Sequence, residues 1–270
     1  MVVEPPCGHG SAALLEKGYR LQCRRCKSFF DGDFAGQNFD YDASYPELRG
    51  HFDEATGEMK RRTFERWLDG AGIDLAGNAV CEVGFGGAHC LAFAAERAAQ
   101  AFGIEAVPEN LARARALGVP DVFPFDGRPD RLPTPVDIWV LLDSFEHLPE
   151  PAGVLDWMAA NSAPGAKALV VAPEAGSTSE RALGRLWPHK LPDHEFHWSR
   201  AGLVEIFERH GFARASEFHP WKYVSGAMLA NHLRHKFPAL ALPGPAVKAL
   251  ARVRLYFNVG QMGLTFERAR

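Results

Sequence analysis

The sequence predicts an α/β protein: a doubly wound, mostly parallel sheet of seven strands with helices on both faces, preceded by a small cysteine-containing segment. Three observations lead to this prediction. Short apolar runs alternate with segments of helical periodicity, a glycine-rich turn follows the first run, and 47% of the 270 residues are apolar. Such alternation favours parallel strands joined by right-handed crossovers, and a chain of this length can bury a sizeable core without metals or disulfides.

The first predicted elements lie between residues 52 and 125. Phe52, Met59, Phe64 and Leu68 share one stripe among charged residues, which predicts a helix over about residues 52–68. A short apolar run that ends in glycines then predicts a buried strand. An alanine-rich helix, a second strand, a helix with proline at its first position and a third strand follow. From the buried strand onward, these elements cover residues 79–83, 88–102, 102–107, 108–117 and 121–125.

The second half of the pattern completes the sheet. The run VDIWVLL at residues 136–142 is apolar on both faces, as a strand inside a parallel sheet requires. Ser199 is typical of a helix N-cap, and Gly211 is expected to end the same helix at His210. The remaining elements are a helix over residues 154–160, strands over 166–172, 212–218 and 261–268, and a helical region over 225–254 interrupted by prolines.

Composition excludes several classes of function. The net charge is −3 with acids and bases mixed along the chain, so nothing indicates the basic face of a nucleic-acid-binding protein. No window has the roughly 18 uncharged apolar residues that a membrane-spanning helix needs. The first ten residues lack the pattern of a signal peptide, so we expect a cytoplasmic protein. Its five cysteines, an odd number, are then expected to be thiols or metal ligands.

The most informative stretch is the glycine turn after the strand at residues 79–83. Gly84 and Gly86 allow the backbone to turn tightly and to approach a ligand closely. An ordinary strand-to-helix turn is the alternative. Glu105 ends the next predicted strand, 23 positions after Glu82, where an acid can accept hydrogen bonds from the ribose hydroxyls of a nucleotide cofactor.

Two residues of this turn argue against a dinucleotide. A pyrophosphate would bind at the helix N-terminus, where the carboxylate of Glu82 is unfavourable. The dinucleotide fingerprint also needs a small residue where this chain has His89. A cofactor without phosphates and with a positive charge suits the acid better.

Taken together, these motifs resemble those of class I S-adenosylmethionine-dependent methyltransferases, which have a Rossmann-like fold. The segment 82–86 is similar to the first motif of that family, with Ala88 in the place of its third glycine, and segments 103–106, 125–127 and 143–149 are similar to later motifs. The resemblance implies that S-adenosylmethionine contacts Glu82, Gly84, Phe85, Gly86, Glu105, Ala106, Asp126, Gly127 and Asp143. Asp126 and Asp143 could instead be ordinary turn residues.

A segment before the core resembles a lid found in related methyltransferases. Tyr41 and Tyr45 stand in a Tyr-Asp-x-x-Tyr stretch, and the resemblance implies that Tyr45 contacts the cofactor. Packing against the first helix is the alternative.

Histidines are the candidate catalytic residues, because an oxygen acceptor needs a base with a pKa near neutrality. His147 follows the strand 136–142, and the family often uses this histidine structurally. His194 and His197 lie in a loop dense in histidine and tryptophan, which the resemblance places at the acceptor site; capping the next helix is the alternative. A metal site formed by His189, His194 and His197 is disfavoured, because only Asp193 and Glu195 stand nearby as further ligands.

The N-terminal segment contains a zinc-knuckle spacing, Cys23-Arg-Arg-Cys26, with Cys7 upstream. It resembles the zinc ribbon that precedes some related methyltransferases, although Glu4 stands where that pattern has a cysteine. His9 would complete a structural zinc site with three sulfur ligands and one nitrogen ligand; a decayed ribbon without metal is the alternative. We therefore divide the chain into a zinc-ribbon-like segment with the lid (residues 1–50) and a cofactor-binding domain (residues 51–270).

The leading functional hypothesis is methylation of a small molecule, at oxygen in preference to nitrogen or carbon. A nicotinamide-dependent oxidoreductase and a non-catalytic partner protein are the competing hypotheses. The region 221–255 could cover the acceptor site or form the surface of a homodimer.

Overall fold

The computed structural model describes residues 7, 9, 14–17, 20–31, 54–148, 150–190, 194, 196–227, 229–230, 243–250 and 252–269. Its centre is a seven-stranded sheet in the order β10-β13-β8-β7-β4-β5-β6. In chain order the strands are β4 (Ala79–Val83), β5 (Gln100–Glu105), β6 (Val122–Pro124), β7 (Val136–Leu142), β8 (Ser162–Pro173), β10 (Phe212–Phe218) and β13 (Gln261–Arg268). The predicted fold class is confirmed.

The sheet is parallel except at one strand. β4 pairs in parallel with β5 and β7, and the pairs β5–β6 and β7–β8 are also parallel. β13 runs antiparallel to both of its neighbours, β8 and β10. The chain steps from β4 outward to β6 and then returns to β7 on the other side of β4. The strand order therefore reverses between β4 and β7, which is where ligands bind in open α/β sheets.

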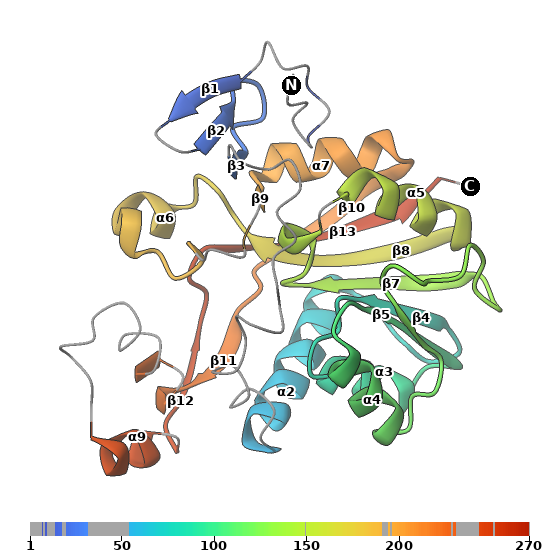
Figure 1. Cartoon of the computed structure of the whole chain (residues 1–270), viewed down its shortest axis with the longest axis horizontal. Coiled ribbons are helices and arrows are strands. Elements are labelled where there is room, and N and C mark those ends of the chain that lie inside the picture. Colours follow the sequence, from blue (N-terminus) through green and yellow to red (C-terminus); the bar gives the residue numbers. More distant parts are fainter. Residues whose placement is uncertain are drawn as a thin grey trace.

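Helices cover both faces of the sheet (Figure 1). α5 (Pro151–Asn161) and α7 (Arg200–Arg209) bury Leu155, Phe207 and their neighbours against one face. α2 (Glu54–Ala71) and α3 (His89–Ala95) pack Phe64 and Phe93 against the other. α4 (Pro108–Ala116) lies beside β5 and β6. No helix among the described residues combines the length and apolar character needed to cross a bilayer.

Ser199 caps α7 as predicted, because its hydroxyl accepts a hydrogen bond from the Gly202 amide at 3.0 Å. The predicted helix over residues 88–102 is wrong in its second half, since α3 ends at Ala95. The Ala99 amide donates to the Asn78 carbonyl, and Ala76 and Ala98 form an isolated bridge. Pairing with the preceding loop thus overrides the helical propensity of the alanines.

The region expected to be helical over residues 225–254 also differs. β11 (Lys222–Ser225) and β12 (Arg254–Phe257) form a two-stranded antiparallel sheet, in which the rings of Tyr223 and Tyr256 lie 4.6 Å apart. Cross-strand aromatic contacts of this kind stabilise strand pairs. Between these two strands, residues 226–227 and 229–230 are helical, as are the residues of α9 (Gly244–Leu250).

The N-terminal segment forms a small sheet with a strand from the second half of the chain. β1 (Leu14–Lys17), β2 (Arg20–Cys23) and β3 (Phe29–Asp31) are antiparallel, and β3 pairs with β9 (Phe196–His197). In Figure 1, β1 and β2 lie above the end of α7 that follows β9. The small sheet is therefore joined by backbone hydrogen bonds to the loop that carries the predicted acceptor-site histidines. The remaining described elements are α6 (Thr178–Leu183) and the 3-10 turns η3 (Phe145–His147) and η4 (Gly184–Leu186).

Candidate functional site

The candidate cofactor site lies at the edge of the sheet where the parallel strands β4, β5, β6 and β7 end. Gly84 and Gly86 both have positive φ, 73° and 50°. A Cβ at Gly84 would come within 2.6 Å of the Cβ of Ser144, so the turn after β4 can pass the turn after β7 only with glycine there. A Cβ at Gly86 would meet no atom within 4 Å, which leaves open space over the turn. Ala88 takes a left-handed conformation, φ 60°, normally favoured by glycine.

The carboxylate of Glu105 holds this turn in position. Its Oε2 accepts a hydrogen bond from the Gly86 amide at 2.7 Å. Its Oε1 accepts from the amides of Ala106 and Val107, both at 3.0 Å. Glu105 is thus a buried acid that fixes the glycine turn from the neighbouring strand.

The other predicted cofactor residues surround the same edge. Glu82 is 4% exposed on β4, and burial raises the pKa of its carboxyl well above the usual value. Phe85 is buried under the turn, whereas Ala106 is exposed just after β5. Asp126 and Gly127 are exposed in the turn after β6. Tyr41 and Tyr45, and with them the predicted lid, lie outside the described residues.

Asp143 follows β7 in a left-handed conformation, φ 50°. One of its oxygens accepts a hydrogen bond from the side-chain amide of Gln261, and the other lies 3.5 Å from the Lys222 ammonium. Burial opposes the charged form, but electrostatic attraction from Lys222 and the neighbouring His189 and His194 outweighs burial and lowers the pKa of the Asp143 carboxyl. Lys222 and Gln261 belong to no local motif, so the sequence alone does not indicate their contacts with Asp143.

The three predicted catalytic histidines come together in the structure. The ring of His194 lies 4.7 Å from that of His147 and 5.9 Å from that of His197, measured between centroids. His189 is a fourth ring of this histidine cluster, 6.4 Å from His194. His194 and His197 are 4% and 2% exposed. Trp187 packs against two of the rings and donates to the Val259 carbonyl at 2.7 Å, which fixes its indole.

The cluster also contains an acid that the sequence analysis did not select. Ligand atoms of Glu146, His147 and His194 all lie within 4.8 Å of one another. Glu146 is 1% exposed. The only acids weighed as metal ligands from the sequence were Asp193 and Glu195, which lie outside the described residues. The nearby carboxylate is that of Glu146 in η3, almost fifty residues before His194. Its position next to His147 in the sequence was the one signal that could have indicated it.

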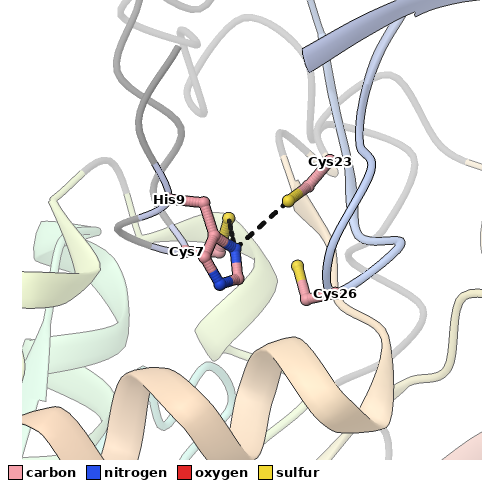
Figure 2. Close-up of side chains that lie close together, drawn as sticks. All are labelled: Cys7, His9, Cys23 and Cys26. Atoms are coloured by element: carbon pink, nitrogen blue, oxygen red, sulfur yellow. Dashed lines mark hydrogen bonds between the residues drawn. The ribbon is translucent and has the colours of Figure 1, made fainter. Parts of the chain in front are cut away.

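The N-terminal cysteines converge as predicted (Figure 2). Cys7, His9, Cys23 and Cys26 are buried, and their ligand atoms lie within 4.8 Å of one another. His9 Nδ1 lies 3.3 Å from Cys7 Sγ and 3.2 Å from Cys23 Sγ. A tetrahedral zinc ion would hold nitrogen and sulfur ligands about 3.6 Å apart, so the cluster fits zinc with small adjustments.

The surroundings of this cluster suit a metal. His9 Nε2 lies 2.8 Å from a carboxylate oxygen of Glu205 on α7, the outer partner that metal-binding histidines usually have. A hydrogen bond from the Cys7 thiol, acting against burial and assisted by Ser28, lowers the pKa of Cys26 to about 5, and the same hydrogen bond together with burial raises the pKa of Cys7. Thiolates are the metal-binding form of cysteine. The Cys7, His9, Cys23 and Cys26 cluster can therefore hold a zinc ion.

The zinc-type cluster is connected directly to the histidine cluster. Ser199, which caps α7, donates to the Cys26 carbonyl through its hydroxyl, and its amide donates to the Ser28 hydroxyl at 3.0 Å. Phe29 stands opposite His197 in the β3–β9 pair. The N-terminal segment thus supports the strand that contains His197 and the start of the helix that follows it.

Comparisons with known proteins agree with this geometry. A family model described as a methyltransferase domain matches residues 54–217. No protein of curated function matches the chain. Among solved structures, a Bacillus halodurans protein described as a methyltransferase has 15% identity and a TM-score of 0.56, with 77% of this chain and 99% of that one covered.

Two further structures share the fold. A chain in the complex between the Haloferax volcanii Trm112 methyltransferase activator and a methyltransferase has 17% identity and a TM-score of 0.56, covering 85% of this chain and 96% of that one. A Thermotoga maritima S-adenosylmethionine-dependent methyltransferase has 14% identity and a TM-score of 0.52, covering 84% and 98%. The family match decides against the nicotinamide-dependent and non-catalytic alternatives. The chain belongs to the methyltransferase-domain family, and it is an S-adenosylmethionine-dependent methyltransferase of the class I, Rossmann-like fold.

Proposed function

We propose that this methyltransferase transfers its methyl group to an oxygen atom of a small molecule. The observation that supports the proposal most directly is the histidine cluster next to the glycine turn. His147 follows Ser144 by three residues, and Ser144 lies against Gly84. Buried imidazoles at the edge of the cofactor site suit an acceptor that must lose a proton.

The cofactor side of the proposal uses the acids and glycines at the ends of β4 to β7. Glu105 would accept a hydrogen bond from a ribose hydroxyl, Asp126 would accept from the adenine amine, and Gly84 and Gly86 would allow close approach of the amino-acid end. Asp143 would place negative charge near the cationic cofactor, and the Glu82 carboxyl would lie beside the same end of the cofactor. When bound, S-adenosylmethionine supplies a methyl group on a positively charged sulfur.

The acceptor side uses His147, His194 and His197. Methyl transfer needs the acceptor aligned with the methyl–sulfur bond, so the chief contribution of these residues is position and orientation. An imidazole of the cluster then takes the acceptor's proton as the new bond forms. The burial of His194 and His197 limits water around the reacting atoms.

The proposal can be tested in two stages. Isothermal titration with S-adenosylhomocysteine, with NAD as a control, measures cofactor binding. A panel of phenolic, carboxylic and amine acceptors then tests for release of S-adenosylhomocysteine, and mass spectrometry of the product locates the methyl group. We expect His197→Ala to reduce turnover at unchanged S-adenosylhomocysteine affinity, whereas the exposed His219→Ala retains both. Methyl groups found on nitrogen or carbon, or full turnover by His197→Ala, would contradict the proposal.

A further inference from the structure

The histidine cluster contains a second group of potential metal ligands, separate from the cysteines. A carboxylate oxygen of Glu146 and one ring nitrogen each of His147 and His194 lie within 4.8 Å of one another. Glu146 and His194 are 1% and 4% exposed. Two of the ligands come from η3, directly after β7, and the third lies just before β9.

The ligand types define the kind of ion. Two imidazoles and one carboxylate form the protein part of catalytic zinc sites, which keep a position open for water or substrate. The same set binds iron(II) with open positions in non-heme enzymes. At metal–ligand distances of about 2.0–2.2 Å, the ligand atoms would lie about 3.0–3.5 Å apart, so small side-chain movements from the observed separation complete the site.

The local arrangement favours convergence on one ion. The rings of His147 and His194 are nearly perpendicular, at 88°, with centroids 4.7 Å apart, so both can approach one point without stacking.

The site has the right neighbours for catalysis. Glu146 is two residues from Ser144, against which Gly84 of the cofactor turn packs. His197 lies 5.9 Å from His194 between ring centroids. An ion held here would therefore lie two residues along the chain from the contact with the glycine turn and near the His197 imidazole.

We propose that Glu146, His147 and His194 bind a divalent transition-metal ion whose open coordination positions take an oxygen of the methyl acceptor. The second half of this statement rests on the proposed function; the metal site itself does not. It assigns His147 and His194 as ligands and leaves His197 to accept the proton. The acceptor class is then a hydroxyl beside a second oxygen, such as a vicinal diol or a hydroxy acid, which can chelate a metal.

The reaction balances without an additional co-reactant. Coordination lowers the pKa of a bound hydroxyl, and its proton passes to the His197 imidazole. The oxygen forms a bond to the methyl carbon while the carbon–sulfur bond breaks. The electron pair of that bond stays on sulfur, which gives neutral S-adenosylhomocysteine and a methyl ether.

Cobalt(II) binding to the full-length, chelator-stripped protein tests the metal site without any acceptor. We expect two equivalents per chain by elemental analysis. One has the intense sulfur-to-cobalt charge-transfer bands of a thiolate site, and the other shows only weaker visible bands. Glu146→Gln and His194→Ala should each lose the second equivalent, and Cys26→Ser should lose the first. His219→Ala, on an exposed histidine outside the cluster, should keep both.

A single equivalent in the wild-type protein, carried by the thiolates, would overturn the proposal. So would a second equivalent that persists in both Glu146→Gln and His194→Ala. If those variants do not fold, the spectrum of the wild-type protein still decides, because the two ligand sets absorb differently. S-adenosylhomocysteine affinity, measured on the same samples, reports separately on the proposed methyltransferase site.

Discussion

Removal of the Glu105 carboxylate should weaken cofactor binding through two identifiable hydrogen bonds. A carboxylate has about four lone-pair positions. Three are occupied by the amides of Gly86, Ala106 and Val107, which leaves one position on Oε2 for a ribose hydroxyl. A hydrogen bond to a charged group contributes about 1.5–3 kcal/mol. Glu105→Ala would lose the proposed ribose bond and also release Gly86, a total of about 3–6 kcal/mol.

At about 1.4 kcal/mol for each factor of ten, this loss corresponds to S-adenosylhomocysteine binding weakened by about 100- to 10,000-fold. Isothermal titration gives the dissociation constant directly. Glu109→Ala is the matched control, because it removes an exposed acid in the first turn of α4. A folded Glu105→Ala protein that binds S-adenosylhomocysteine as tightly as the Glu109→Ala control would refute the reasoning.

Three further outcomes are expected. Burial raises the pKa of Glu82, so the stability that this residue contributes is complete at low pH and is lost as pH rises through the folded-state pKa. Thermal unfolding should therefore show Glu82→Gln gaining stability over wild type with rising pH. Parallel curves of stability against pH for the two proteins would contradict this. Gly202→Ala places a methyl group against the Ser28 hydroxyl and 3.0 Å from Cys26 Sγ. This substitution should destabilise the protein by about 1–3 kcal/mol in chemical denaturation and weaken zinc binding. Unchanged stability would show that the loop with Cys26 and Ser28 moves to make room for the methyl group. Removal of zinc, or Cys26→Ser, should speed hydrogen exchange at the β9 amides, including that of His197, and leave S-adenosylhomocysteine affinity unchanged. Equal exchange rates with and without metal would show that the zinc-type cluster does not stabilise the strand of the histidine cluster.

The sequence predicted the sheet well because a buried parallel strand is a local signal. The run that became β7 is apolar on both faces, and the structure buries it between β4 and β8. The glycine turn was equally readable, because a positive φ at Gly84 and Gly86 requires a particular residue type. The same local reasoning failed for α3, where alanine propensity predicted a helix that pairing with residues 76–78 ends early.

The candidate site was predictable where its residues belong to contiguous motifs. Glu82, Glu105 and Asp126 stand at strand ends, and the parallel pairing brings those ends to one edge. The spacing of Cys23 and Cys26 indicated a zinc knuckle. The prediction that His9 replaces the missing fourth cysteine is supported by the position of its ring between two sulfur atoms.

By itself, then, the sequence determined the fold class and the residues of the zinc-type cluster, and it indicated the edge of the sheet where we propose that the cofactor binds. The tertiary structure alone decided that Lys222 and Gln261 meet Asp143, that β3 pairs with β9, and that Glu146 approaches His194. The physical reason is range. Periodicity and turn chemistry act over a few residues, whereas these contacts join segments tens to more than a hundred residues apart that only the packed sheet brings together.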